Sequence, residues 1–263
     1  MCGLTGWFGL NLPDKHKQEE LFRLLMRKAQ VRGTDSFGVA FAQGQNTTVH
    51  RGLGPVSKWL AKDRQRVRRI ARSSIVVGHT RAASRGDVTL RNAHPFRVGD
   101  WIGAHNGCLQ NSMELMVSAR YTPRGETDSE EALTWLVSEG LTADAFRKLH
   151  GSFAMTIVKA DATELIIAVD SRTPFAIAEV GGGVVWHSLG DALGSSLQAV
   201  GLGAEVMEVK NQLLRFPTAD SEALVVHSEA PSPWPRGVFE SKDDRVMVES
   251  EARQIELAEV WDE

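Results

Sequence analysis

Cys2 has the clearest potential for chemistry in this chain, because it directly follows the initiator methionine. A small residue at this position usually allows Met1 to be removed, and Cys2 would then carry a thiol and a free α-amine together. The thiolate is the attacking form of cysteine, and a free cysteine is mostly protonated near neutral pH. The α-amine has a reference pKa of about 7.7–8.0, so it can accept the thiol proton, directly or through a water. The alternative is that Cys2 is a small buried residue that opens a strand.

Two internal motifs carry groups that bind negative charge. Arg81 ends the run Gly78-His79-Thr80-Arg81, and a guanidinium at the end of a buried strand can hold a carboxylate. The amide of Asn106 and the N–H of Gly107 can both point at one oxyanion. The alternatives are a surface salt bridge for Arg81 and a hairpin turn for Asn-Gly.

Two more motifs lie where predicted elements begin or end. Arg32 opens Arg-Gly-Thr-Asp-Ser-Phe-Gly, which reads as a turn from a helix into a strand. Asp128 lies in Glu-Thr-Asp-Ser-Glu at a predicted helix start, where a simple N-cap is the structural alternative.

The composition is that of a soluble globular protein. The chain has 263 residues, with 42% hydrophobic and 24% charged residues and a formal charge of −3, so nothing draws it to nucleic acid or anionic membranes. It has neither an apolar run of the length of a membrane span nor a signal peptide at its N-terminus. The cysteines Cys2 and Cys108 are too few for a disulfide framework, and no metal-binding motif is present. The basic segment 62–72 is expected to be a solvated helix face, with contact to nucleic acid or an acidic partner as the alternative.

The order of predicted elements indicates an α+β domain of two packed sheets with helices outside. The predicted helices span 17–31, 56–72, 128–139 and 191–200, and the predicted strands span 4–10, 36–42, 47–51, 75–79, 101–105, 153–159, 165–169, 175–178, 184–187, 205–209, 213–216 and 224–227. After His227 the composition becomes proline-rich and then acidic. We therefore expect a domain at 2–228 and an extension at 229–263.

Taken together, these motifs resemble the glutaminase domain of class II glutamine amidotransferases, which are N-terminal-nucleophile (Ntn) hydrolases. The matching motifs are, in order, Cys-Gly-Leu-x-Gly from Cys2, Arg-Gly-x-Asp-Ser-x-Gly from Arg32, Gly-His-Thr-Arg from Gly78, Asn-Ala-His-Pro-Phe from Asn92, His-Asn-Gly from His105 and Thr-Asp-Ser-Glu from Thr127. Each motif is weak alone, but six in the correct order are not expected by chance. The resemblance covers residues 2–227 and implies a four-layer αββα sandwich of two mainly antiparallel sheets.

The resemblance implies a role for each motif. Cys2 would attack the side-chain amide of glutamine, and its α-amine would carry the proton to the leaving ammonia. Asn106 and the N–H of Gly107 would hold the oxyanion, while Arg81 and Asp128 would bind the α-carboxylate and α-ammonium of glutamine. Water would then release glutamate from a γ-glutamyl thioester.

Other residues receive supporting roles from the same resemblance. Thr80 and His105 complete the predicted substrate-binding set, although His105 is not needed as a general base because the amine fills that role. Arg32 would support the N-terminal strand and the active-site turn, and His79 and His94 are expected to be structural. No cofactor or metal is expected.

One segment departs from the family pattern. The family often has an aromatic residue directly after the arginine, and this chain has Ala82. Residues 82–86 would lie in the mobile loop over bound glutamine, with Gly86 as a hinge. Arg85 and the small residues of this loop put its closure and the affinity for substrate in question.

The partner and the final reaction remain open at this stage. About 35 residues follow His227, too few for a fused synthase domain, so a stand-alone cytoplasmic glutaminase would pass ammonia to a separate synthase subunit. The first alternative is a free-standing γ-glutamyl amide hydrolase. The second is a non-catalytic glutamine-binding regulatory module, against which the intact Cys2, Arg81, Asn106, Gly107 and Asp128 argue.

Overall fold

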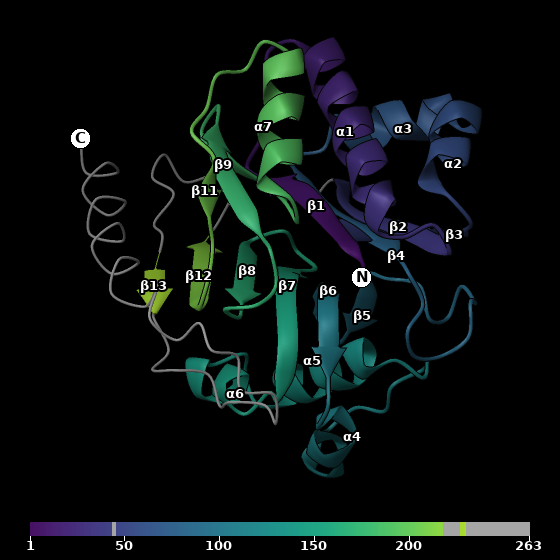
Figure 1. The fold of residues 1–263 in the computed structure, drawn as a ribbon, viewed down its shortest axis with the longest axis vertical. Helices are drawn as coiled ribbons and strands as arrows, with labels where there is room; N and C mark the ends of the chain where they lie inside the picture. Colours follow the sequence, from purple (N-terminus) through teal and green to yellow (C-terminus); the bar gives the residue numbers. More distant parts are fainter. Residues whose placement is uncertain (44–45, 218–226, 230–263) are drawn as a thin grey trace.

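Two stacked β-sheets with helices on both outer faces make up the structure, a computed structural model that describes residues 1–43, 46–217 and 227–229 (Figure 1). Every strand pair in the described part of the chain is antiparallel. The predicted α+β class and the αββα layering are therefore confirmed.

The first sheet holds the N-terminal strand at its centre. In its order β11-β9-β10-β1-β4-β2-β3, β1 pairs with β10 on one side and β4 on the other. Its strands are β1 (Gly3–Phe8), β2 (Ser36–Gln43), β3 (Asn46–Leu53), β4 (Ile75–Arg81), β9 (Ala176–Val180), β10 (Gly183–His187) and β11 (Met207–Glu208). Cys2 precedes β1 and is therefore held at the end of the central strand.

The second sheet carries the Asn106-Gly107 motif and packs against the first sheet. Its order is β13-β12-β8-β7-β6-β5, and the motif lies on β6. The strands are β5 (Phe96–Val98), β6 (Trp101–Leu109), β7 (Gly151–Lys159), β8 (Glu164–Val169), β12 (Gln212–Pro217) and β13 (His227–Glu229).

The helices cover the outer faces of both sheets (Figure 1). The helices beside the first sheet are α1 (Lys15–Ala29), α2 (Val56–Lys62), α3 (Arg64–Ala71) and α7 (Gly190–Ala199), with the 3₁₀ turn η1 (Gln30–Arg32). Those beside the second are α4 (Ser112–Leu115), α5 (Asp128–Ser138) and α6 (Ala143–Arg147), with η2 (Met116–Ser118).

Three apolar clusters fill the spaces between the four layers. Phe22 lies between the first sheet and its helices, Trp186 lies between the sheets, and Phe146 lies between the second sheet and its helices. All three side chains are almost fully buried. This burial of apolar surface is the main term that holds the layers together.

The sequence predicted most elements within a few residues, and one helix was wrong. The predicted helix 56–72 is two helices, because Asp63 leaves helical geometry and its side chain caps α3 by accepting from the N–H of Arg66. The short elements β5, α4 and α6 were not predicted. Residues 224–226 and the extension 230–263 lie outside the described residues.

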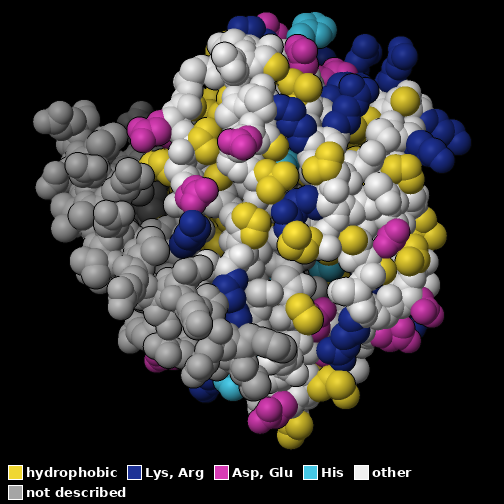
Figure 2. All heavy atoms as spheres, viewed as in Figure 1, with side chains coloured by type: hydrophobic (Ala, Val, Ile, Leu, Met, Phe, Trp, Pro, Cys, Tyr) yellow, Lys and Arg dark blue, Asp and Glu magenta, His cyan; other side chains and the backbone are white. Residues whose placement is uncertain are grey.

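Basic side chains gather on α3, as the sequence predicts for a solvated helix face. Val67, Ile70 and Ala71 are buried against the core, while the arginines point outward. Figure 2 shows dark blue side chains where α2 and α3 lie in Figure 1. No helix among the described residues combines the length and apolar character needed to cross a membrane.

Candidate active site

Three segments far apart in the sequence meet at Cys2. The backbone nitrogen of Cys2 donates to Asn106 Oδ1 at 3.0 Å, across a separation of 104 residues. Its Sγ lies 3.7 Å from the carbonyl oxygen of Ala82, the first residue after β4. Because Gly3 is paired with Thr80, the strand register also brings Cys2 beside Arg81. The ends of β1, β4 and β6 therefore form one group.

The thiol of Cys2 is partly buried, and burial raises its pKa. The hydrogen bond to Ala82, the positive chain terminus and Arg81 act in the opposite direction, whereas Asp128 raises the pKa further. The thiol is therefore protonated near neutral pH and needs a base before it can attack.

In the side-chain amide of Asn106, the oxygen has a hydrogen-bond partner in the described part of the chain and the nitrogen has none there. Its Oδ1 accepts from Cys2, whereas its Nδ2 is buried with no hydrogen-bond partner among the described residues. An unpaired buried donor costs about 1–3 kcal/mol, so such a group calls for an explanation. At Gly107, φ is +148°, and a Cβ there would lie 2.0 Å from the carbonyl oxygen of Ser152. Only glycine fits at this position.

Arg81 is held by the loop that follows it. Its guanidinium donates to the carbonyl oxygens of Arg85 at 2.5 Å, Gly86 at 3.1 Å and Asp87 at 3.1 Å. A guanidinium has five N–H donors, so two remain for another acceptor. The residue is 3% exposed, so its guanidinium is largely shielded from solvent.

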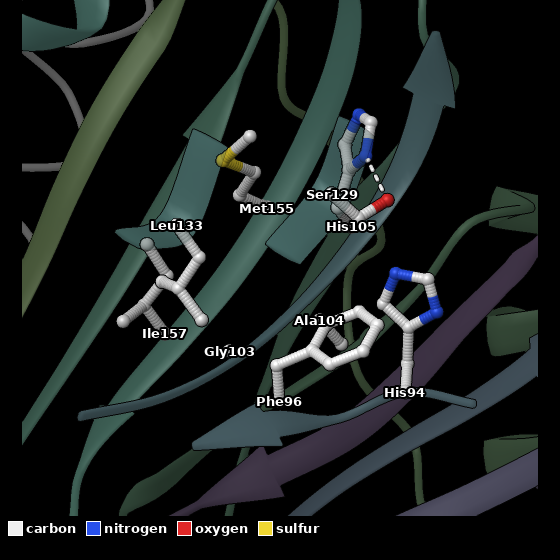
Figure 3. Close-up of a pocket in the computed structure, with 9 residues that line it drawn as sticks. All are labelled: His94, Phe96, Gly103, Ala104, His105, Ser129, Leu133, Met155 and Ile157. Atoms are coloured by element: carbon white, nitrogen blue, oxygen red, sulfur yellow. Dashed lines mark hydrogen bonds between the residues drawn. The ribbon is translucent and has the colours of Figure 1, made fainter. Parts of the chain in front are cut away.

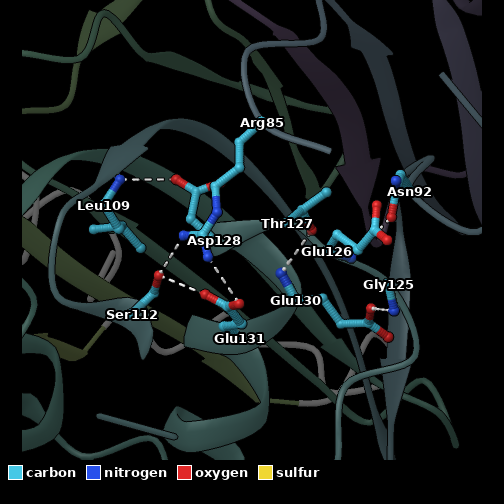
Figure 4. A network of polar contacts seen from close by, with 10 residues as sticks. All are labelled: Arg85, Asn92, Leu109, Ser112, Gly125, Glu126, Thr127, Asp128, Glu130 and Glu131. Carbon is cyan, nitrogen blue, oxygen red and sulfur yellow. Dashed lines mark hydrogen bonds and ion pairs between the residues drawn. The ribbon is translucent and has the colours of Figure 1, made fainter. Parts of the chain in front are cut away.

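The predicted loop over the substrate is fastened to α4 and α5 (Figure 4). Arg85 makes an ion pair of 3.0 Å with Glu131 and donates to Ser112 Oγ at 3.1 Å. Ser112 in turn donates to Glu131 at 2.7 Å. Gly86 has φ +74°, a backbone conformation that favours glycine. The sequence did not predict these contacts of Arg85, because neither Glu131 nor Ser112 belongs to a motif that indicates a partner for it.

Asp128 begins α5, and of the two N-cap candidates in the sequence, Thr127 and Asp128, Thr127 is the cap. One carboxylate oxygen, Oδ2, accepts from the N–H of Leu109 at 2.8 Å (Figure 4). This bond ties the start of α5 to the end of β6, two residues beyond Gly107. The carboxylate is 7% exposed and retains its second oxygen for another donor.

Arg32 lies behind the N-terminal strand. Its Nε donates to the carbonyl oxygen of Cys2 at 2.6 Å, and its Nη2 lies 3.3 Å from the sulfur of Met1. Gly3 faces α1, where a Cβ would lie 2.5 Å from the carbonyl oxygen of Ala29. Met1 itself is 81% exposed, so few contacts would be lost with its removal.

The side chains of Thr80 and His105, both predicted to bind substrate, have hydrogen-bond partners within the protein. Thr80 donates to the carbonyl oxygen of Ala29 at 2.7 Å, on the face of β4 opposite Arg81. His105 lies on the face of β6 opposite Asn106 and is 2.8 Å from Ser129 Oγ. Neighbouring residues of a strand point to opposite faces, so the Thr80 side chain points away from that of Arg81 and the His105 ring away from that of Asn106. Both still lie close to the backbone of the group, because Thr80 Oγ1 is beside Gly3 and His105 Nε2 is beside Gly107.

The predicted structural histidines stack in the core beneath the group. The rings of His79 and His94 lie 4.0 Å apart. Burial lowers the pKa of His79 to about 3 and also lowers the pKa values of His94 and His105, so all three are neutral.

A cavity of about 10 Å³ lies beside His94 and His105 (Figure 3). No group of three metal-ligating residues occurs in the described part of the chain.

Comparison with known proteins adds a family and a fold. Residues 14–167 match the family model described as "Glutamine amidotransferases class-II". Glutamine–fructose-6-phosphate aminotransferase from Staphylococcus aureus is 30% identical over 196 residues, which are 67% of this chain and 30% of that protein. The enzyme of the same name from Thermococcus kodakarensis is 31% identical over 191 residues. The chain thus spans about 30% of the length of these curated relatives.

Two solved structures share the fold. Glutamine phosphoribosylpyrophosphate amidotransferase from B. subtilis, complexed with ADP and GMP, has a TM-score of 0.64 at 22% identity. That match covers 88% of this chain and 49% of the other. A glutamine aminotransferase class-II domain protein from Silicibacter pomeroyi has a TM-score of 0.54 at 17% identity, over 88% of this chain and 100% of its own. These likenesses confirm the predicted Ntn-type fold.

Proposed function

We propose, from the premise that this chain belongs to the class II glutamine amidotransferases, that it hydrolyses the side-chain amide of glutamine through Cys2. The thiol attacks the carboxamide carbon, the carbon–nitrogen bond breaks and ammonia leaves. Water then cleaves the γ-glutamyl thioester and releases glutamate. The observation that carries this proposal is the buried, unpartnered Nδ2 of Asn106, whose Oδ1 accepts from the backbone nitrogen of Cys2.

The unpartnered amide acts as an oxyanion donor. In this proposal Asn106 Oδ1 orients the nitrogen of Cys2 while Nδ2 donates to the oxygen of the tetrahedral intermediate. The N–H of Gly107 provides the second donor. A donor that is fixed before the reaction stabilises developing charge without reorganisation, which accounts for a buried N–H left without a partner in the absence of substrate.

The base is the α-amine of Cys2, which becomes free once Met1 is removed. The high exposure of Met1 supports this step. The raised pKa of the Cys2 thiol makes a base necessary, and the amine is attached to the same residue. It takes the thiol proton during attack and returns a proton to the leaving nitrogen.

The α-carboxylate and the α-ammonium of glutamine each bind a side chain of opposite charge. Arg81 uses its two remaining donors on the α-carboxylate, and Asp128 uses its free oxygen on the α-ammonium. Holding both ends positions the amide for attack by Cys2. Arg32 supports the backbone of Cys2 from behind.

The fate of the ammonia defines two versions of the proposal. In the first, ammonia passes to a separate acceptor enzyme. In the second, the chain is a γ-glutamyl amide hydrolase without an acceptor. The second version is kept because Arg81 and Asp128 contact only the glutamyl head, which both kinds of substrate share. Release of ammonia from glutamine alone, compared with release of amine from γ-glutamyl amides, separates the two versions.

Intact-mass analysis after incubation with 6-diazo-5-oxo-L-norleucine tests the proposal. This glutamine analogue alkylates a reactive thiol with loss of nitrogen gas. We expect one adduct on protein that has lost Met1, with glutamine protecting against labelling. Cys108→Ala is the matched control and should label fully. Labelling that persists in Cys2→Ala, or active protein that retains Met1, would contradict the proposal.

Arg81→Lys should weaken substrate binding more than it slows the chemical step. Lysine keeps the charge but lacks the fork that can hold a carboxylate and three carbonyl oxygens at once. We expect KM for glutamine to rise by about tenfold to a hundredfold, the loss of one or two charge-assisted hydrogen bonds, with a smaller change in kcat. Glutamate release measured against glutamine concentration gives both values. An unchanged KM would remove Arg81 from substrate binding.

A further inference from the structure

A second cavity, distinct from the group around Cys2, is lined almost entirely by arginine. It has a volume of about 360 Å³, and its lining residues are Arg51, Arg91, Arg97, Arg124 and Glu130. The arginines come from β3, from the segment between β4 and β5, from β5 itself and from the segment between η2 and α5, while Glu130 comes from α5. Four separate segments thus bring guanidinium groups together, at a volume typical of small-molecule sites.

The positive charge of this cavity is largely uncompensated. The side chains of Arg91, Arg97 and Arg124 are exposed and make no hydrogen bond or ion pair with any described residue. Glu130 is 4% exposed and accepts from the N–H of Gly125 at 2.6 Å. One carboxylate faces four guanidinium groups, so three positive charges remain without a partner.

Arg51 forms the fixed wall of the cavity. Its Nε donates to the carbonyl oxygen of Pro95 at 2.9 Å, and a second nitrogen donates to the same oxygen. Burial lowers the pKa of Arg51; Arg124 acts in the same direction and Glu130 in the opposite one. The guanidinium is therefore charged, partly desolvated and close to another cation. Such an arrangement is unfavourable until an anion enters.

We propose that this cavity binds a small organic phosphate. Guanidinium groups match phosphate oxygens in a two-pronged geometry, and a dianion would offset most of the uncompensated charge. The volume exceeds what inorganic phosphate needs, so room remains for the organic part of the molecule. Glu130 provides an acceptor for a hydroxyl or amine of that part.

Asn92 connects the segments that carry two of these arginines with the loop that holds Arg81, and Figure 4 shows Asn92 beside Glu126. Asn92 donates to the carbonyl oxygen of Asp87 at 3.0 Å and accepts from the N–H of Glu126 at 3.0 Å. It therefore joins the loop next to Arg91 with the segment next to Arg124. Glu130 lies two residues after Asp128 on α5. A phosphate bridging Arg91 and Arg124 would strengthen the same connection.

Calorimetric titration of the wild-type chain, without glutamine, tests this proposal independently of the proposed function. Glucose 6-phosphate is the probe, glucose is its neutral counterpart, and inorganic phosphate tests the organic part. We expect glucose 6-phosphate to bind more tightly than inorganic phosphate, and glucose not to bind. Binding should weaken as salt is added. Equal binding of glucose and its phosphate, equal binding of the ester and inorganic phosphate, or no heat from either anion would overturn the proposal.

Variants locate the site. The double variant Arg97→Gln, Arg124→Gln should weaken glucose 6-phosphate binding by about a hundredfold, because each arginine contributes about tenfold. These side chains have no partner in the described structure, so thermal melting should be unchanged, and Arg124→Gln alone should show the smaller loss. Arg27→Gln, an exposed arginine on α1, is the matched control and should bind normally. An equal loss in Arg27→Gln, or no loss in the double variant, would rule out this cavity.

Discussion

Replacing Cys2 with alanine is expected to lower glutamate release from glutamine by about 10⁶-fold, the scale at which loss of a nucleophile removes covalent catalysis. The variant retains the α-amine, the oxyanion donors and the groups proposed to hold glutamine, but it has no atom that can form the thioester. Alanine is also small enough to allow removal of Met1, so the loss reports on the sulfur and not on processing. Glutamate release is measured with purified protein, and intact mass confirms the N-terminus.

Cys108→Ala is the matched control for this variant. Cys108 is exposed and is the only other cysteine of the chain. Its substitution should leave glutamate release near the wild-type level. Full activity in Cys2→Ala, or a comparable loss in Cys108→Ala, would show that the reaction does not proceed through Cys2.

Asn106→Ala is expected to lower kcat by about 10²–10³-fold, the cost of losing one oxyanion donor, with little change in KM. The side chain contacts the nitrogen of Cys2, and its free Nδ2 is proposed to bind charge that exists only after attack. An interaction made with the transition state alone lowers kcat and kcat/KM equally. Steady-state kinetics with glutamine give both constants.

The matched control is Asn11→Ala, which removes a surface amide that accepts from Lys15. It should leave both constants unchanged. Thermal melting shows whether Asn106→Ala still folds, and labelling by 6-diazo-5-oxo-L-norleucine shows whether the thiol remains accessible. A folded Asn106→Ala protein with normal kcat would exclude the amide from the oxyanion site.

The local pattern of the sequence predicted the elements that lie near the site. The apolar spacing of 17–31 and the cap at Thr127 correspond to α1 and α5, because helix periodicity and capping are properties of neighbouring residues. The same reasoning missed the break at Asp63, where one residue leaves helical geometry within a continuous amphipathic pattern. It also missed β5, which has only three residues and exists through its pairing with β6.

The direction of the Thr80 side chain follows from the strand pattern of the sequence. His79 and Arg81 alternate with Thr80 on one strand, so a strand assignment places Thr80 on the opposite face from Arg81. The same alternation separates His105 from Asn106 on β6. The side chains of adjacent motif residues therefore lie on two faces of the strand, and substrate binding by Thr80 and His105 stays a prediction.

The chemical groups of this protein and its family follow from its residues alone, because residue types, their order and local periodicity are properties of the chain. Folding was needed to bring the nitrogen of Cys2 to the amide of Asn106, the loop carbonyl oxygens around Arg81, and the arginines of four segments into one cavity. Strand pairing and the packing of layers set these distances between residues that are far apart in sequence. No local pattern encodes them.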